Sequence, residues 1–295
     1  MIDLASLVSL RAVDRHGSVI AAAEMLGFTP SAVSQQVKRL ERQVGVPLLE
    51  RVGRGVMLTG PGRQLVDDGS RLLGDLERIE AGLHRTAGTV AGHLRLAAFS
   101  TAVRGLVAPA LRPLLDAHPD LTLTVSEREP WDTVDLVAAG HVAPAVHQPD
   151  VDVPLAVPEH LTSTVVAHDV ADVLAPLGHP LAGRARVAPR DLLDEAWIAT
   201  PEGTICREWL LRMYDGTGRV PDVAHVSMEF GSHVALVQAG LGIALVPRLG
   251  RGELPEGVVA VPAHDPVPTR LISVLHRRSM AGSPAVGALV EALGG

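Results

Sequence analysis

Apolar residues between positions 30 and 44 recur at a spacing that only an α-helix brings to one face. They lie at i, i+4, i+7 and i+11, and they are Val33, Val37, Leu40 and Val44. This spacing predicts a helix with one buried stripe. Thr29 and Pro30 suit its start. A threonine hydroxyl accepts a first-turn N–H, and proline lacks the N–H that the first turn leaves unpaired.

Two shorter helices are predicted before this one. Asp3 is placed to cap the first, which Gly17 ends, and Ser18 is placed to cap the second, which Gly27 ends. Small alanines at 21–23 allow a neighbouring helix to approach closely. Two helices, a tight turn and a third amphipathic helix form the pattern of a helix-turn-helix.

The polar face of the third helix has a composition suited to DNA. It holds three basic residues and no acid before Glu41, and its members are Ser31, Ser34, Gln35, Lys38, Arg39 and Arg42. Lysine and arginine bind phosphates or guanine edges, and serine and glutamine reach phosphates or base edges. A solvated face is the simpler interpretation of an isolated amphipathic helix. The basic residues and the preceding helix favour DNA.

The stretch "PLLERVGRGVMLTGPG" predicts a β-hairpin, or wing, directly after the third helix. Its two apolar runs flank the Gly-Arg-Gly at 53–55. Arg51 and Arg54 then lie near the tip of the hairpin, within reach of the sugar-phosphate backbone. Thr59 and Pro61 indicate the start of another helix.

The charge of the chain is divided unevenly. Of 26 basic and 33 acidic residues, 1–90 hold 11 and 10, a balance of +1, and 91–295 hold 15 and 23, a balance of −8. The single cysteine, Cys206, cannot form a disulfide within the chain and fits a reducing compartment. The sequence shows neither a signal peptide nor a run of about 18 apolar residues. We therefore expect a cytoplasmic protein with no membrane partner.

Residues 61–87 repeat apolar side chains at seven-residue steps. The steps and the positions between them are occupied by Leu65, Leu72, Leu76, Ile79 and Leu83, with Gly69 as a defect. Such an a/d seam needs a partner, because the rest of the helix is charged. Packing on its own domain is the alternative. A dimer-forming helix is favoured, with contacts through Leu72, Leu76, Ile79 and Leu83.

From residue 93 onward short apolar runs alternate with helical stretches, which predicts an α/β domain with a parallel-type sheet. Ligands bind such sheets at strand ends, near helix N-termini. Two points of this kind carry hydroxyls, and the candidate ligand-binding residues are Ser100, Thr101, Thr200, Gly203 and Thr204. Helix-start N–H groups favour an anion such as a carboxylate. The alternative is that each hydroxyl only caps its helix.

The segment "GSVIAAAEMLGFTPSAVSQQVKRLERQVGVPLLERVGRGVMLTGPG" resembles the N-terminal domain of LysR-type transcriptional regulators over more than 40 residues. The departures are apolar exchanges, with Leu10 and Leu49 where the family usually has phenylalanine and Val37 where it usually has isoleucine. Further along, "LRLAAFSTA" and "ALVQAGLGIALVP" resemble parts of the two lobes of the family's effector domain.

The resemblance implies a winged helix-turn-helix at 1–60, a linker and dimerisation helix at 61–90, and an effector domain at 91–295. The effector domain is expected to be a two-lobed α/β unit similar to a type 2 periplasmic binding protein. Lobe I is expected at about 91–162 and 268–295, and lobe II at about 163–267. The implied partners are double-stranded operator DNA, a small-molecule effector in the interlobe cleft and further copies in a dimer or tetramer. RNA polymerase is left open as another partner. No cofactor and no enzymatic activity are expected.

One motif departs from the family pattern. Family members commonly read Gly-x-Leu-Asp-Leu-Ala-Ile where this chain reads "GHVAPAV" at 140–146. Ala143 replaces the aspartate, and Pro144 interrupts a strand that is expected to be central. The resemblance itself therefore supports only Ser100 and Thr101 in the pocket.

Other functions are weaker alternatives. Cys206 lies just inside a predicted helix start, which would lower its pKa, but the sequence offers it no nearby general base, and a buried core cysteine is simpler. A single cysteine cannot form the bridge used by the peroxide-sensing subgroup of the family. The 13 histidines show no metal-binding spacing. Solute transport or enzymatic use of the C-terminal domain are the alternatives, and the DNA-binding head argues against both.

Overall fold

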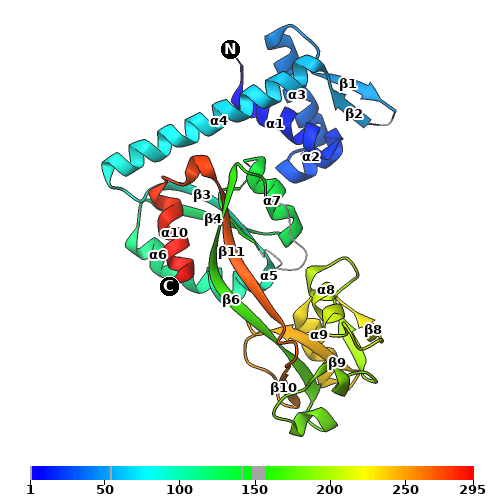
Figure 1. Ribbon diagram of the computed structural model, residues 1–295. Coiled ribbons are helices and arrows are strands. Elements are labelled where there is room, and N and C mark those ends of the chain that lie inside the picture. Colours follow the sequence, from blue (N-terminus) through cyan, green and yellow to red (C-terminus); the bar gives the residue numbers. More distant parts are fainter. Residues whose placement is uncertain (1, 54, 141, 148–156) are drawn as a thin grey trace.

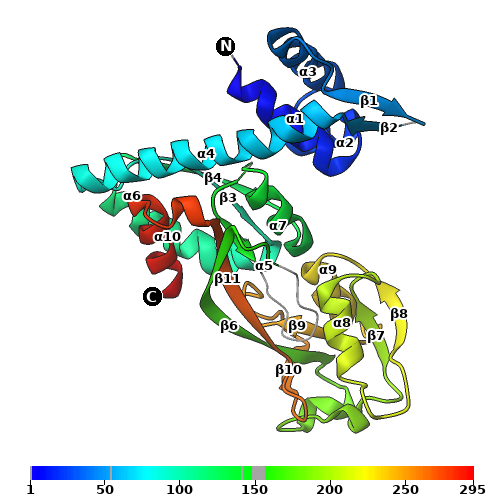
Figure 2. The same ribbon diagram turned by 45° about the horizontal axis from the view of Figure 1, so that its top comes forward.

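The computed structural model describes residues 2–53, 55–140, 142–147 and 157–295. A helical head, a long linker helix and a two-lobed body follow one another along the chain (Figure 1). The linker helix lies along lobe I, and two long strands run from lobe I into lobe II (Figures 1 and 2). Arg54, one of the two predicted wing contacts, lies outside the described residues.

The head consists of three helices and a hairpin: α1 (Leu4–His16), α2 (Val19–Leu26), α3 (Pro30–Val44), β1 (Leu49–Val52) and β2 (Gly55–Leu58). The predicted caps are present. Asp3, Ser18 and Thr29 each accept a first-turn N–H, and Gly17 and Gly27 end their helices with left-handed backbone. The first three members of the apolar stripe of α3 are buried in a core shared with α1 and α2.

The linker helix α4 (Gly60–Ala87) is continuous over 28 residues. Its first turns pack on the core of the head through Leu65 and Val66, so Leu65 is used within the chain rather than in the predicted seam. Gly69 is also used within the chain. A Cβ at Gly69 would lie 2.4 Å from Cδ2 of Leu7, so this glycine lets α1 approach α4 closely.

Lobe I is a sheet in the order β4-β3-β5-β11-β6 with helices on its faces. Its own strands are β3 (Gly92–Ala98), β4 (Leu121–Glu127) and β5 (Ala145–His147). Its helices are α5 (Ser100–Ala102), the π-helical turn η1 (Val103–Val107), α6 (Ala108–Ala117), α7 (Pro130–Ala138), η4 (Arg278–Met280) and α10 (Pro284–Gly294). Leu96, Val274 and Leu289 are fully buried in its core. Strand β5 begins directly after Pro144, which has no N–H for a sheet ladder.

Lobe II holds the shorter strands β7 (Ala196–Ala199), β8 (Asp222–Val226), β9 (Ile243–Pro247) and β10 (Val258–Pro262). Its helices are η2 (Pro180–Gly183), η3 (Pro189–Asp191), α8 (Ile205–Arg212) and α9 (Phe230–Gln238). Trp197 is fully buried at its centre and donates its indole N–H to the Tyr214 hydroxyl at 2.7 Å. That hydroxyl donates in turn to the carbonyl of Leu192 at 2.6 Å, so the buried polar groups are paired.

The two crossing strands, β6 (Leu161–Pro176) and β11 (Thr269–Arg277), belong to both lobes. They pair with each other antiparallel up to Val170, and from Ala171 onward β6 pairs with β9 and β10 of lobe II. The expected lobe boundary at 162/163 therefore falls inside a continuous strand. The expectation of a parallel-type sheet is only partly correct: β3 and β7 have parallel neighbours, whereas the crossing strands make the sheet mixed.

We expect Gly69→Ala to destabilise the head, and Gly82→Ala on the same helix to stabilise the chain. Both changes remove backbone freedom from the unfolded chain, and alanine favours a helix interior by up to about 1 kcal/mol over glycine. At Gly69 the new methyl group meets Leu7, whereas nothing lies within 4 Å of the Cβ position at Gly82. Crowding of a packed contact costs about 1–3 kcal/mol. Thermal melting of both variants tests this, and equal shifts in one direction would contradict it.

Candidate DNA-binding face and interlobe cleft

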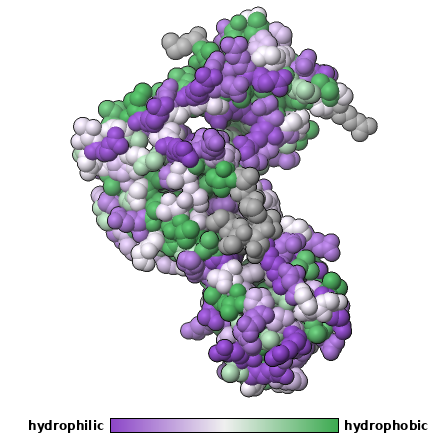
Figure 3. Space-filling model, in the orientation of Figure 1, coloured by the Kyte–Doolittle hydropathy of each residue, from purple (hydrophilic) through white to green (hydrophobic). Residues whose placement is uncertain are grey.

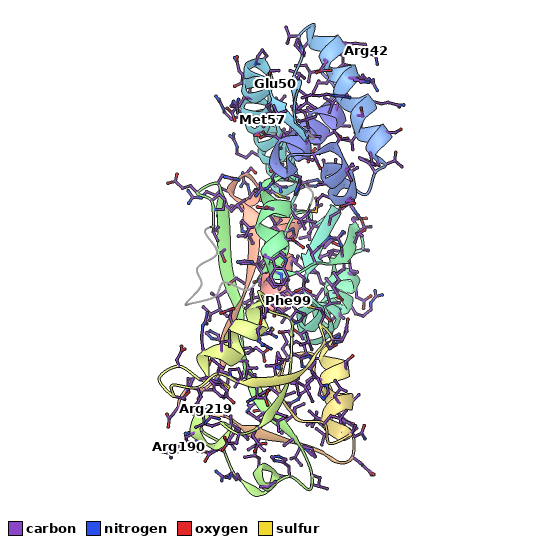
Figure 4. The ribbon with its side chains drawn as sticks, turned by 90° about the vertical axis from the view of Figure 1, so that its right-hand side faces the viewer. Arg42, Glu50, Met57, Phe99, Arg190 and Arg219 are labelled. Atoms are coloured by element: carbon purple, nitrogen blue, oxygen red, sulfur yellow. The ribbon has the colours of Figure 1, made fainter. Side chains whose placement is uncertain are left out.

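The basic face of α3 points away from the body of the protein. Gln35, Lys38, Arg39 and Arg42 are exposed, as is Ser31 at the first turn, and Figure 4 shows Arg42 on the outer surface of the head. Ser34, by contrast, is half-buried. Five of the six residues predicted on this face are thus open to a partner, and one is partly covered.

An open groove of about 910 Å³ runs beside α3 and the turn that leads to the wing. Gln35, Lys38, Arg39 and Arg42 line it. The Arg39 guanidinium is only 4.0 Å from the carboxylate of Asp3, an exposed pair that contributes little and leaves the arginine available. Cations and an amide along an open groove can bind phosphates and base edges.

Glu41, the acid at the edge of the basic face, has an internal role that the sequence pattern did not reveal. Its carboxylate accepts the backbone N–H groups of Leu48, at 2.8 Å, and Leu49, at 3.3 Å. These bonds tie the start of the wing to α3. Because Glu41 faces backbone donors, its charge is directed inward and the outer face of α3 stays basic.

The wing presents residues of both charges. Arg51 and Glu50 are exposed on β1, and Figure 4 shows Glu50 and Met57 on the hairpin. Arg51 is therefore placed where the sequence predicts it, on an exposed strand beside the recognition surface.

Four of the five predicted ligand-binding residues line one cavity between the lobes. Ser100 and Thr101 come from lobe I, and Thr200 and Thr204 come from lobe II. The cavity measures about 70 Å³, enough for only a few water-sized groups in this conformation. Gly203 does not line it; its φ of 77° serves the turn before α8.

The hydroxyls of these residues already have partners. Thr204 caps α8 by accepting the N–H of Arg207 at 3.2 Å, as the alternative interpretation predicts, and its Oγ1 is 2.6 Å from that of Thr200. In lobe I, the Ser100 hydroxyl accepts from Arg104 at 2.9 Å. Thr101 is buried, and its hydroxyl accepts from Arg270 at 2.8 Å.

Arg270 is the residue of the cleft that sequence reasoning missed. It lies on the crossing strand β11 with 5% of its surface exposed. Its Nη2 is 2.7 Å from Oδ2 of Asp169 on β6, and its guanidinium lies 5.2 Å from the ring centre of Phe99 and 5.6 Å from that of Trp209. An arginine inside the otherwise apolar run "TRLISVLHR" is the sequence signal that could have identified it.

Carboxylates and aromatic rings complete the cleft, and both were missed at the sequence level. The carboxylates are Glu127, Glu129 and Glu229, and the rings are Phe99, Trp131 and Phe230. Figure 4 shows Phe99 at the junction of the lobes. Burial first, and then the neighbouring negative charges of Glu127, Asp132 and Glu229, raise the pKa of Glu129.

Cys206 also lines the cleft, but it is not activated. Burial raises the pKa of its thiol, which outweighs the lowering expected from the start of α8. The expectation of a lowered pKa is therefore wrong. Over the described part of the chain, no three His, Cys, Asp or Glu side chains gather where they could hold a metal ion. Nor does any described helix combine the length and apolarity needed to cross a membrane.

A basic helix-turn-helix head joined by a long helix to a two-lobed domain with a cleft defines a ligand-responsive DNA-binding protein. Residues 4–63 match the family model of the bacterial regulatory helix-turn-helix protein, lysR family, and residues 87–295 match the LysR substrate binding domain. Because these matches span most of the chain, it belongs to the LysR family of transcriptional regulators. The resemblance, the fold class and the regulatory, non-enzymatic function predicted from the sequence are confirmed.

The relatives are regulators along their full length. A RuBisCO operon transcriptional regulator from Allochromatium vinosum is 30% identical over 305 residues, which cover 98% of this chain and 95% of that protein. A full-length OxyR variant from Pseudomonas aeruginosa is similar with a TM-score of 0.71 at 21% identity, covering 99% and 95% of the two chains. Full-length CbnR in complex with its target DNA is similar with a TM-score of 0.58 at 20% identity, covering 99% of both. These two structural likenesses show the fold.

We expect Lys38→Ala and Arg39→Ala each to weaken binding to operator DNA without lowering the melting temperature. The loss of one phosphate contact should reduce the slope of log affinity against log salt by about 0.9. Arg190→Ala is the matched control, since Figure 4 shows Arg190 at the far end of the molecule from Arg42. Fluorescence anisotropy over a salt series measures both quantities. An unchanged affinity and slope for both variants would exclude α3 as the recognition helix.

Proposed function

We propose that α3 is the recognition helix that this regulator places in the major groove of its operator, with the wing on the adjacent backbone. Support comes from the exposed basic side chains along an open groove and from the inward-facing Glu41. The proposed DNA-binding residues are Ser31, Ser34, Gln35, Lys38, Arg39, Arg42, Arg51 and Arg54. We place this activity in the cytoplasm, with RNA polymerase as the partner on which the bound regulator acts.

The linker helix α4 is proposed to form the dimer. Leu72, Ile79 and Leu83 are 48%, 59% and 67% exposed, and Leu76 is half-buried. Hydrophobic residues interrupt the hydrophilic surface along this helix (Figure 3). A second copy of α4 would bury this seam, as in a coiled coil. Two heads then meet two half-sites, and a tetramer follows if the effector domains pair as well.

The effector is proposed to bind in the cleft between the lobes. The observation that carries this proposal is that hydroxyl-bearing strand ends of both lobes meet in one cavity beside the hinge. A ligand that contacts both lobes favours the conformation in which it binds more tightly. The proposed division of the chain is a head at 1–60, a linker at 61–90 and an effector domain at 91–295.

Strand β11 offers a route from the cleft to the head. Arg270, at the hinge, lies seven residues before Arg277, which binds the linker helix through Glu77 at 2.8 Å. Arg277 also donates to the Val142 carbonyl of lobe I at 2.9 Å. On the head, Arg11 of α1 donates to the Ala138 carbonyl of α7 at 2.9 Å. A shift of the lobes would therefore change contacts at both the linker and the head.

We expect Ile79→Asp to break the dimer and to reduce affinity for an operator with two half-sites. An aspartate in the seam would bury an unpaired charge. Leu177→Asp is the matched control, since Leu177 is 64% exposed on a turn of lobe II. Multi-angle light scattering gives the mass of each variant. A wild-type monomer at micromolar concentration would exclude the α4 dimer.

We expect the Ser100→Ala,Thr101→Ala variant to need more effector for the same response. The loss of a hydrogen bond to a charged group costs about 1.5–3 kcal/mol, a tenfold to hundredfold loss in affinity. Ser163 and Thr164, an adjacent exposed pair on β6, provide the control double variant. Genome-wide mapping of binding sites identifies the operator, and the neighbouring genes suggest candidate effectors for a reporter titration. An unshifted dose response would place the pocket elsewhere, and lost basal DNA binding would assign these residues a structural role.

A further inference from the structure

The ionisable groups of the cleft are predominantly acidic. Glu127, Glu129 and Glu229 line the cavity, and the cation among the lining residues is Arg270. That arginine is held by Asp169, which cancels its charge, and donates to Thr101. The nearby cations point elsewhere: Arg104 donates to the Gly250 carbonyl and the Ser100 hydroxyl, and Arg128 donates to the backbone carbonyl of Glu127. An entering anion would meet three carboxylates and an arginine that is already engaged.

The aromatic side chains of the chain gather at the same place. The sequence holds three phenylalanines, three tryptophans and one tyrosine, seven aromatic residues in all. Three of these seven, Phe99, Trp131 and Phe230, line the cleft. Trp131 remains 37% exposed. Aromatic faces carry negative potential and attract organic cations, most strongly ammonium groups.

A buried acceptor without a partner adjoins the cleft. His233 is 1% exposed, and its Nε2 is 2.9 Å from the Ser227 carbonyl. Its Nδ1 has no hydrogen-bond partner among the described residues. Burial lowers the pKa of His233, so the neutral ring donates through Nε2 and Nδ1 is an acceptor. The ring faces a small cavity of about 10 Å³, which shares Thr200, Cys206 and Phe230 with the cleft.

The carboxylates come from opposite lobes. Glu127 and Glu129 belong to lobe I, and Glu229 caps the start of α9 in lobe II. Glu229 lies close enough to act on the charge of Glu129 and raise its pKa. Like charges on the two sides of a hinge repel each other, so the empty cleft resists closing. A positive group between them would remove this repulsion and draw the lobes together.

We propose that the effector of this regulator is a small organic cation, a protonated amine or quaternary ammonium on a short apolar body. Its positive group binds Glu129 and Glu229, and its apolar body packs on Phe99, Trp131 and Phe230. This inference rests on the proposed role of the cleft and replaces the carboxylate expected from helix-start N–H groups. Those N–H groups belong to short helices, and the hydroxyls beside them are already bonded to Arg104, Arg270 and each other.

The test compares matched probes on the full-length protein by calorimetry and by thermal shift. The cations are benzylammonium, tetramethylammonium and butane-1,4-diammonium, and the matched anion and neutral molecule are benzoate and benzyl alcohol. We expect at least one of the cations to bind at millimolar concentration or below and to raise the melting temperature. Benzoate and benzyl alcohol should have no effect, because the carboxylates repel the first and offer the second no charge.

The variants Glu129→Gln,Glu229→Gln and Trp131→Ala should each lower cation affinity at least tenfold, and Glu253→Gln, an exposed carboxylate outside the cleft, should not. Melting without ligand separates a lost site from a lost fold. Because the pKa of Glu129 is raised in the folded chain, its contribution to stability is lost as pH rises through that pKa. Glu129→Gln should therefore melt higher than wild type at neutral pH, and the difference should vanish below the ordinary carboxyl pKa of about 4.3.

Three results would overturn the cationic effector: no binding by any of the three cations at millimolar concentration, undiminished cation binding in the double variant, or benzoate binding that the double variant strengthens. The last result would leave the cleft as the effector site and change only the charge of its ligand. The proposed function fails separately, if the Ser100→Ala,Thr101→Ala variant leaves the operator response of the regulator unshifted.

Discussion

The buried ion pair between Arg270 and Asp169 joins the two crossing strands at the point where the chain passes from one lobe to the other. Asp169 also accepts the N–H of Leu249, and Arg270 reaches Thr101 and packs beside Phe99. A buried pair of this kind adds little net stability, yet removal of one partner leaves an uncompensated charge. It therefore fixes the register of the hinge rather than its strength. The cleft, its hydroxyls and the path along β11 to the linker helix all depend on that register.

The cleft shows how an interior arrangement can make a ligand part of the structure. Carboxylates of opposite lobes face each other, aromatic rings stand beside them, and a buried imidazole presents an unpaired acceptor. Each of these features is unfavourable or unfulfilled without a partner, and a small cation satisfies all three. The same arrangement supplies the energy difference between open and closed lobes that an effector needs in order to act on distant DNA.

Local elements were predictable because their signals lie within a few residues of one another. The caps at Asp3, Ser18 and Thr29, the apolar stripe of α3 and the long helix α4 follow from spacing and side-chain chemistry alone. Two interpretations of local pattern were changed by long-range packing. Gly69 is a close contact with Leu7 rather than a defect in a seam, and burial outweighs the helix start at Cys206.

The sequence by itself determined the class of this protein: a basic recognition helix, a wing, a linker helix and a two-lobed domain, each encoded by short-range periodicity and turn chemistry. It also placed four hydroxyl residues that line the cleft. Only the tertiary structure decided what surrounds them. Arg270, Glu129 and Glu229 are distant in sequence and meet because β6 and β11 cross between the lobes. No local pattern encodes such a meeting, since charge and burial at a site depend on which strands pair and how far each one runs.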